Sequence, residues 1–143
     1  MTDFARVRRA MVDNQLRTYD LSYSDQPLIV GDAGSEGPRV MLAPMVLARI
    51  LQNLQLREGE RVLDMAGGLG YSAAVMARMG ARVVALESNE ALADRARDNL
   101  AKLGLSAVEV AVGPLEGGAP AQAPFDVILI NGAIQRRPDA VLE

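Results

Sequence analysis

The amino-acid sequence predicts an α/β protein with a doubly wound, mostly parallel sheet. From residue 61 onwards, short apolar segments with the length of strands alternate with longer segments that show helical spacing. This alternation is typical of a parallel sheet that helices cover on both faces. Residues 127–130, VILI, are apolar without alternation, as expected for a strand that is buried on both sides.

The first 56 residues are expected to be the less regular part of the domain. Residues 3–18 show the spacing of an amphipathic helix. Residues 19–40 are predicted to be irregular, because Gly and Pro punctuate them. An irregular segment of that length is unusual in a compact domain unless it has a function. A helix is expected from Pro44 to about residue 56, since Pro suits the first turn of a helix.

The remaining residues are predicted to form the sheet and its helices. The expected strands are residues 61–65, 82–87, 108–112 and 125–130. The expected helices are residues 71–79 and 90–103, with the start of a third at 138–143. We therefore expect a single domain, residues 1–143. Its N-terminal helix, loop and substrate-side segment would be residues 1–56, and its ligand-binding α/β core would be residues 57–143.

The composition excludes several kinds of chemistry. The 143 residues include no His, Cys or Trp, which removes Ser-His-Asp and Cys-His nucleophilic sites, disulfides and zinc sites built on His or Cys. The net charge of −3 argues against a nucleic-acid partner, for which a basic face is expected. The sequence shows neither a signal peptide nor a bilayer-spanning segment, so we expect a cytoplasmic protein with no membrane partner and no metal.

The most informative segment is residues 64–70, DMAGGLG, between a predicted strand and a predicted helix. Glycines there let the backbone turn sharply and let a ligand approach it. A helix that begins at Tyr71 would direct unpaired N–H groups at the same point. Glu87 follows Gly67 by twenty residues, at a strand end where a carboxylate can accept hydrogen bonds from a ribose. The alternative interpretation, which assigns these residues no function, is a tight turn beside a solvated acid.

Two classes of ligand fit this pattern. Residues 68–73, GLGYSA, match the dinucleotide fingerprint G-x-G-x-x-A. The other class is S-adenosylmethionine, which Asp64 favours, because an acid at that position would repel a pyrophosphate but attract an ammonium group. A helix also precedes the first core strand, whereas dinucleotide-binding domains usually begin with that strand. The residues favour the methyl donor, and a nicotinamide-dependent dehydrogenase is the alternative.

Several segments match the motifs of one enzyme family. Residues 61–71, RVLDMAGGLGY, look like the family's donor-binding motif RVLEIGTGSGY, and residues 11–17, MVDNQLR, look like its N-terminal MVxxQLR. Further similar stretches are residues 23–28, 93–105, 108–110 and 123–128. The sequence thus resembles the protein-L-isoaspartate O-methyltransferase family. The resemblance implies a Rossmann-like fold, S-adenosyl-L-methionine as cofactor, and protein repair by methyl transfer to a carboxylate of a protein or peptide.

The resemblance and the residue pattern together indicate a cofactor site at the carboxyl ends of the strands. Glu87 would hold the ribose, and Asp64 with the glycine turn would hold the methionine end. Asn131 and the two residues after it would face the methyl acceptor, or would form an ordinary Asn-Gly turn. A carboxylate acceptor is already ionised at neutral pH, so the transfer needs no general base. The expected cofactor-binding residues are Asp64, Ala66, Gly67, Gly68, Gly70, Tyr71, Glu87, Pro114 and Asn131.

Two departures from the family pattern concern the site. Residues 40–44, VMLAP, replace the family's TISxP, so Leu42 stands where a Ser helps to hold the substrate, and no catalytic residue is assigned. Leu42 either faces the acceptor or points into the core beside Val46. Residues 113–115, GPL, replace GDG, so Pro114 offers the adenine no carboxylate. Leu42 leaves open a methyltransferase for another substrate, and Pro114 leaves open a donor-binding module without catalysis.

A third departure is that the family's last three strands have no counterpart. In the expected strand order 3-2-1-4, the apolar fourth strand would be a bare sheet edge, which soluble proteins avoid. We therefore expect that further chain, or a partner such as a second copy in a homo-oligomer, covers this edge.

Overall fold

The computed structural model describes residues 24–32 and 38–142, which include a four-stranded parallel sheet. The strands of this sheet are β3 (Arg61–Met65), β4 (Arg82–Glu87), β5 (Glu109–Val112) and β6 (Val127–Ile130). Their order is β5-β4-β3-β6, and every neighbouring pair is parallel. The predicted α/β class and strand order are confirmed. The helix expected at residues 3–18 lies outside the described residues.

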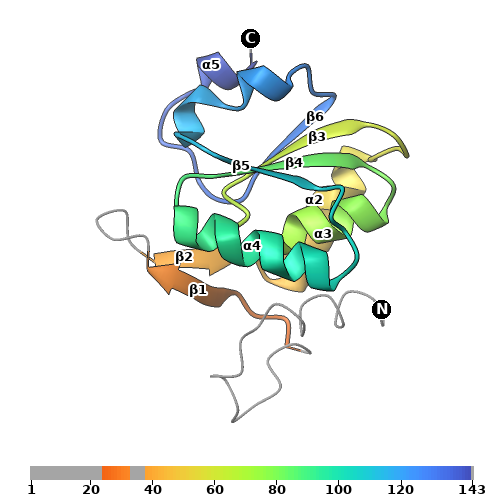
Figure 1. Ribbon diagram of the computed structural model, residues 1–143, viewed down its shortest axis with the longest axis vertical. Coiled ribbons are helices and arrows are strands. Elements are labelled where there is room, and N and C mark those ends of the chain that lie inside the picture. The colour runs from red at the N-terminus through yellow and green to blue at the C-terminus, as the bar shows by residue number, and fades with distance from the viewer. Residues whose placement is uncertain (1–23, 33–37, 143) are drawn as a thin grey trace.

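Helices cover the two faces of the sheet unequally. Figure 1 shows α2 (Pro44–Leu54), α3 (Tyr71–Arg78) and α4 (Glu90–Lys102) on one face. The other face carries the short helix α5 (Asp139–Leu142) and two single-turn 3₁₀ helices, η3 (Leu115–Gly117) and η4 (Pro120–Gln122). The helices end within two residues of the predicted positions, and α2 ends where Gln55 adopts a left-handed conformation.

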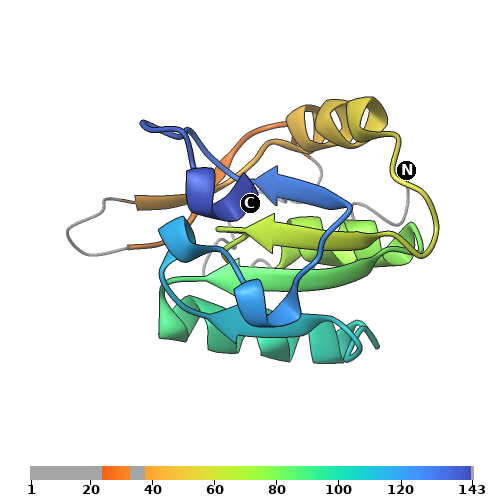
Figure 2. The ribbon, with the colours of Figure 1, turned by 90° about the horizontal axis from the view of Figure 1, so that it is seen from above.

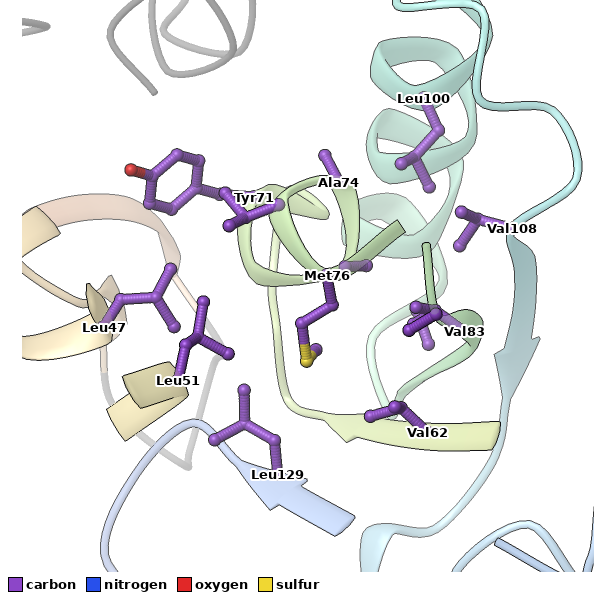
Figure 3. Packing of buried hydrophobic residues seen from close by; sticks show 14 of the residues in the cluster. Leu47, Leu51, Val62, Tyr71, Ala74, Met76, Val83, Leu100, Val108 and Leu129 are labelled. Atoms are coloured by element: carbon purple, nitrogen blue, oxygen red, sulfur yellow. The ribbon is translucent and has the colours of Figure 1, made fainter. Parts of the chain in front are cut away.

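Alternate residues of the strands feed two apolar clusters, one on each face of the sheet. The main cluster joins the sheet to α2, α3 and α4, as Figure 3 shows. Its buried members include Leu47, Leu51, Val62, Tyr71, Met76, Val83, Leu100 and Leu129. The smaller cluster contains Leu63, Met65, Val84, Leu86 and Ala119. Within β6 only Leu129 is fully buried, because this strand lies at an edge of the described sheet.

An antiparallel hairpin precedes α2, in a segment where the sequence predicts no regular structure. Its strands are β1 (Leu28–Asp32) and β2 (Pro38–Met41). The prediction of an irregular segment was wrong here, because Gly and Pro were given more weight than the apolar residues between them. Two short apolar runs around the Gly-rich residues 34–37 are a hairpin signal. Leu28 pairs with Met41, and both are buried in the main cluster, which attaches the hairpin to the core.

Among the described residues, no helix combines the length and apolar character needed to cross a membrane.

Candidate functional site

The turn between β3 and α3 has three residues in the left-handed region. The φ angles are 57° at Ala66, 62° at Gly68 and 84° at Gly70. Glycine adopts this conformation at little cost, whereas a residue with a Cβ pays about 1–2 kcal/mol. The glycines at positions 68 and 70 are therefore required by the backbone, and Ala66 carries strain at the point where the chain leaves the sheet.

Asp64, at the centre of the site, is fully buried and hydrogen bonded on both carboxylate oxygens. Its Oδ2 accepts from Ser72 Oγ at 2.7 Å, and its Oδ1 accepts from Asn131 Nδ2 at 2.7 Å. Burial raises the pKa of Asp64 to about 6, although these hydrogen bonds act against the increase. A Cβ on Gly67 would lie 2.8 Å from Asp64 Oδ2, so this position needs glycine because the turn passes directly over the acid. The role of Asp64 toward a methionine end stays a prediction.

Asn131 ties the end of β6 to the end of β3. Besides its bond to Asp64, its Nδ2 donates to the Met65 carbonyl at 3.0 Å. The Asn131 backbone N–H donates to the same carbonyl, also at 3.0 Å. The exposed residues Gly132 and Ala133 follow. The side chain thus fixes the turn that was expected to face the acceptor, and contact with an acceptor stays a prediction.

Glu87 lies against the glycine turn, as its position at the end of β4 predicts. It is 2% exposed, and its Oε2 accepts from the Gly68 backbone N–H at 3.1 Å. Its Oε1 accepts from the backbone N–H groups of Ser88 at 2.9 Å and Asn89 at 3.3 Å. The same oxygen also pairs with Arg39 Nη2 at 2.8 Å. The structure therefore brings together two predicted site residues and one cation that the sequence reasoning missed.

Arg39 was missed because the segment that carries it was expected to be irregular. The hairpin packs onto the site, since a Cβ on Gly68 would lie 3.2 Å from Val30 Cγ2. Arg95 of α4 holds it there by donating to the Val30 carbonyl at 3.0 Å. Figure 2 shows β1 and β2 extending toward the end of the sheet to which the strand arrows point. The signal that could have found Arg39 is its place in a short strand that follows a Gly-rich turn.

Two further predicted residues border the site. Tyr71 begins α3 and is buried in the main cluster, directly after the left-handed Gly70. Pro114 precedes η3, and its neighbour Gly113 donates to the Glu87 carbonyl at 3.1 Å. Both residues therefore lie beside the ends of strands that carry the site.

Leu42 is partly buried and packs against the main cluster. This position agrees with the expectation that its side chain joins the core, but Val46, the expected neighbour, is 48% exposed on α2. Within residues 24–32 and 38–142, no group of three or more His, Cys, Asp or Glu side chains is placed to hold a metal ion.

The arrangement fits a ligand with a ribose and a polar chain. From β3 the chain passes to β4 and β5 on one side and then to β6 on the other. Open α/β sheets bind ligands at such a switch point, outside the carboxyl ends of the strands. Here that position combines an acid that can bind hydroxyl groups, Glu87, with a glycine turn and the start of α3. A side chain at position 67 would clash with Asp64 Oδ2, so the turn can pass this close to the acid only with glycine at that position.

The fold is that of the Rossmann-like methyltransferases. A solved structure named protein-L-isoaspartate O-methyltransferase has a TM-score of 0.81 and 26% identity, and the match covers 99% of this chain and 47% of that chain. A second one is an S-adenosylmethionine-dependent methyltransferase from Thiobacillus denitrificans in complex with S-adenosyl-L-homocysteine. Its TM-score is 0.56 with 27% identity, and the match covers 64% of this chain and 37% of that chain.

The family follows from the sequence comparisons. The family model described as protein-L-isoaspartate(D-aspartate) O-methyltransferase matches residues 3–143, and the chain belongs to this family. The protein-L-isoaspartate O-methyltransferase of Methylorubrum populi is 46% identical over 120 residues, which are 84% of this chain and 54% of that protein. The chain spans about half the length of the curated relatives it matches.

Proposed function

We propose that the chain binds S-adenosyl-L-methionine and serves an enzyme that methylates isoaspartyl carboxylates of proteins or peptides. The observation that carries the proposal is the contact between Glu87 Oε2 and the Gly68 backbone N–H at 3.1 Å, at the switch point of the sheet. It places an acid that can accept hydrogen bonds from hydroxyl groups beside a glycine turn at the carboxyl ends of the strands. The Thiobacillus denitrificans relative, whose structure contains S-adenosyl-L-homocysteine, supports the same class of ligand.

Each end of the ligand has a group on this chain that suits it. Glu87 would accept hydrogen bonds from the ribose hydroxyls. The N–H groups at the start of α3 suit the methionine carboxylate, because a helix N-terminus attracts anions. Asp64 lies behind this turn and keeps Ser72 and Asn131 in place through its two hydrogen bonds. When bound, S-adenosyl-L-methionine would supply a methyl group that the positive sulfur activates for transfer.

The acceptor chemistry requires positioning more than proton transfer. A carboxyl group with a pKa of about 4 is ionised at neutral pH and can act as the nucleophile directly. A chain without His suits such a reaction. Holding two reactants in a near-attack geometry can supply about 7–11 kcal/mol of the barrier reduction. The exposed turn after Asn131 is the segment that we assign to the acceptor side, since it lies next to the end of β3.

A different methyl acceptor is the second candidate function. Leu42 packs against the main cluster at the position where the family pattern has a Ser, so this chain lacks a hydroxyl donor there. An acceptor that does not need that donor would suit the site as well. Pro114 similarly stands where the family pattern has a carboxylate for the adenine. The assays must therefore distinguish an enzyme from a module that binds S-adenosyl-L-methionine without catalysis.

Calorimetric titration tests the proposed ligand. The 143-residue chain is titrated with S-adenosyl-L-homocysteine and, in parallel, with NAD. We expect heat of binding for S-adenosyl-L-homocysteine and none for NAD; the reverse would replace the proposal with a dinucleotide site. A methyl-transfer assay then compares an isoaspartyl peptide with the same peptide containing normal aspartate. Transfer to neither peptide, in a chain that binds the ligand, would favour the other acceptor or the binding module.

A further inference from the structure

Glu87 has its capacity to accept hydrogen bonds nearly filled by groups of the protein. Its Oε1 accepts from Arg39 Nη2 at 2.8 Å and from the N–H groups of Ser88 at 2.9 Å and Asn89 at 3.3 Å. Its Oε2 accepts from the Gly68 N–H at 3.1 Å. A carboxylate offers about four lone-pair sites. These sites are filled at Oε1, so a ribose hydroxyl that donates to Oε1 needs one of the donors on that oxygen to leave.

Arg39 is the donor that can leave. Three of the other donors are backbone N–H groups, fixed by the end of β4 and by the glycine turn, and the fourth, Ser88 Oγ, is at the long distance of 3.5 Å from Oε1. Arg39 reaches Glu87 from β2 through a long side chain, and the same Nη2 atom also donates to Ser88 Oγ at 2.8 Å. Its Nε is buried without an acceptor among the described residues, so the pairing satisfies the guanidinium group only in part.

The ion pair also holds the hairpin in place over the site. Val30 of β1 lies against Gly68, and the Val30 carbonyl accepts from Arg95. On the same strand, a Cβ on Gly31 would lie 3.0 Å from Leu92 Cδ2 of α4. The hairpin thus contacts both the glycine turn and the helix after β4, and Arg39 adds the contact to Glu87 between them. Moving Arg39 away from Glu87 would release one of the contacts that hold the hairpin.

We propose that Arg39 and the ribose of the ligand compete for Glu87. The Arg39–Glu87 ion pair holds the hairpin against the glycine turn, and binding exchanges this ion pair for a hydrogen bond from a ribose hydroxyl group. Arg39 is then a positioning residue that sets the affinity for S-adenosyl-L-methionine. Part of the binding free energy is used to break the Arg39–Glu87 ion pair. This inference rests on the proposed function, which supplies the ribose.

The test compares Arg39→Met with the unsubstituted chain in titrations with adenosine and with 2′,3′-dideoxyadenosine. Methionine keeps the apolar stem but donates no hydrogen bond. We expect Arg39→Met to bind adenosine about ten- to a hundredfold more tightly, because one competing charged hydrogen bond is gone. The gain should disappear with 2′,3′-dideoxyadenosine, which has no hydroxyl groups to offer Glu87. Arg95→Met is the matched control, since it loosens the hairpin without touching Glu87. The ratio of its affinities for adenosine and 2′,3′-dideoxyadenosine should equal that of the unsubstituted chain.

Hydrogen exchange on the unsubstituted chain provides a second test that needs no variant. Adding S-adenosyl-L-homocysteine should slow amide exchange in the glycine turn and speed it in β1 and β2. Slower exchange in both regions would overturn the competition. Adenosine binding that is equal or weaker in Arg39→Met would also overturn it, provided that the unsubstituted chain binds S-adenosyl-L-homocysteine. Absence of any binding by the unsubstituted chain would instead overturn the proposed function, and the inference with it.

Discussion

Asn131 Nδ2 donates a hydrogen bond to Asp64 Oδ1 over 2.7 Å, between residues that are 67 positions apart in the sequence. The bond joins the turn after β6 to the end of β3. Because Ser72 donates to the other oxygen of Asp64, one buried carboxylate connects β3, α3 and β6. A change in the charge of Asp64 should therefore affect the stability of the chain as well as the shape of its site.

Asp64 should make the chain less stable as the pH rises from 4 to 6. Its pKa is raised from 3.8 to about 6 mainly by burial, so in this range the folded chain binds more protons than the unfolded chain. The stabilisation is complete below pH 4 and is lost as the pH passes 6. The free energy of unfolding should fall by about 3 kcal/mol, at 1.36 kcal/mol for each pKa unit. Urea unfolding at several pH values measures this change.

Asp64→Asn should remove most of this pH dependence. The matched control is Asp98→Asn, which removes an exposed carboxylate from α4. An Asp64→Asn chain that unfolds with the same pH dependence as the unsubstituted chain would assign the effect to other groups.

Glu87→Ala should weaken the binding of S-adenosyl-L-homocysteine by a few kcal/mol. Two hydrogen bonds between a carboxylate and the ribose would be lost, each worth about 1.5–3 kcal/mol. Glu109→Ala, an exposed acid on β5, is the control that changes the net charge equally. Calorimetric titration gives both affinities. Unchanged affinity of Glu87→Ala would remove this residue from the ligand site.

Gly68→Val should abolish binding of S-adenosyl-L-homocysteine. The new side chain would occupy the turn and press on Val30, whose Cγ2 lies 3.2 Å from the Cβ position. Gly104→Val controls for backbone strain, because Gly104 has a φ of 71° and no atom within 4 Å of its Cβ position. Both variants should lose stability on the order of 1–2 kcal/mol from the left-handed conformation. Normal binding and stability in Gly68→Val would mean that the glycine loop is only a turn.

Leu42→Ser should speed methylation of an isoaspartyl peptide, which we expect to be slow in the unsubstituted chain. A hydroxyl group at this position can donate to the substrate carboxylate, and one such bond corresponds to about a ten- to hundredfold change in rate. Leu42→Ala is the matched control, because it loses the same packing against the main cluster without gaining a donor. Equal rates in the Ser and Ala variants, or rapid methylation by the unsubstituted chain, would contradict this prediction.

The 143-residue chain should self-associate through β6, which pairs only with β3 among the described strands. An apolar strand with unpaired backbone groups favours pairing with a second chain. Sedimentation velocity measures the association, and a stable monomer of 15.3 kDa would contradict it. Val127→Lys should weaken the association, because charges at a sheet edge oppose such pairing.

The sequence predicts the parallel core more accurately than the N-terminal hairpin. The bounds of β3 and β4 agree with the prediction, since both are apolar segments between clear turn signals. The contact between Gly68 and Glu87 also follows, because parallel strands bring their carboxyl ends to one edge. In contrast, β1 contains a Gly and β2 begins with a Pro, and both residues are depleted in strands, so propensity alone gives these strands little weight.

The contacts that close the site depend on tertiary structure. Arg39 and Glu87 are 48 positions apart, and Asp64 and Asn131 are 67 apart. Each contact depends on where a side chain points once the hairpin or β6 has docked onto the core. Residue types and spacing identify Asp64 and Glu87 as candidate site residues. They do not identify the side chains that donate hydrogen bonds to these two acids.

The sheet order implies that the two halves of the site form at different stages of folding. Residues 61–87 form one local βαβ unit, which contains the glycine turn and Glu87. β6 pairs with β3 only after the chain has passed through α4 and β5, so its docking closes a much longer loop. The glycine turn and Glu87 can therefore form early in folding. Asp64 receives its hydrogen bond from Asn131 only when β6, the last strand of the described sheet, has docked. Docking of β6 onto β3 buries the Asp64 carboxylate before its hydrogen bond from Asn131 has formed, which opposes the docking. Protonation of Asp64 removes the charge and should make this docking faster.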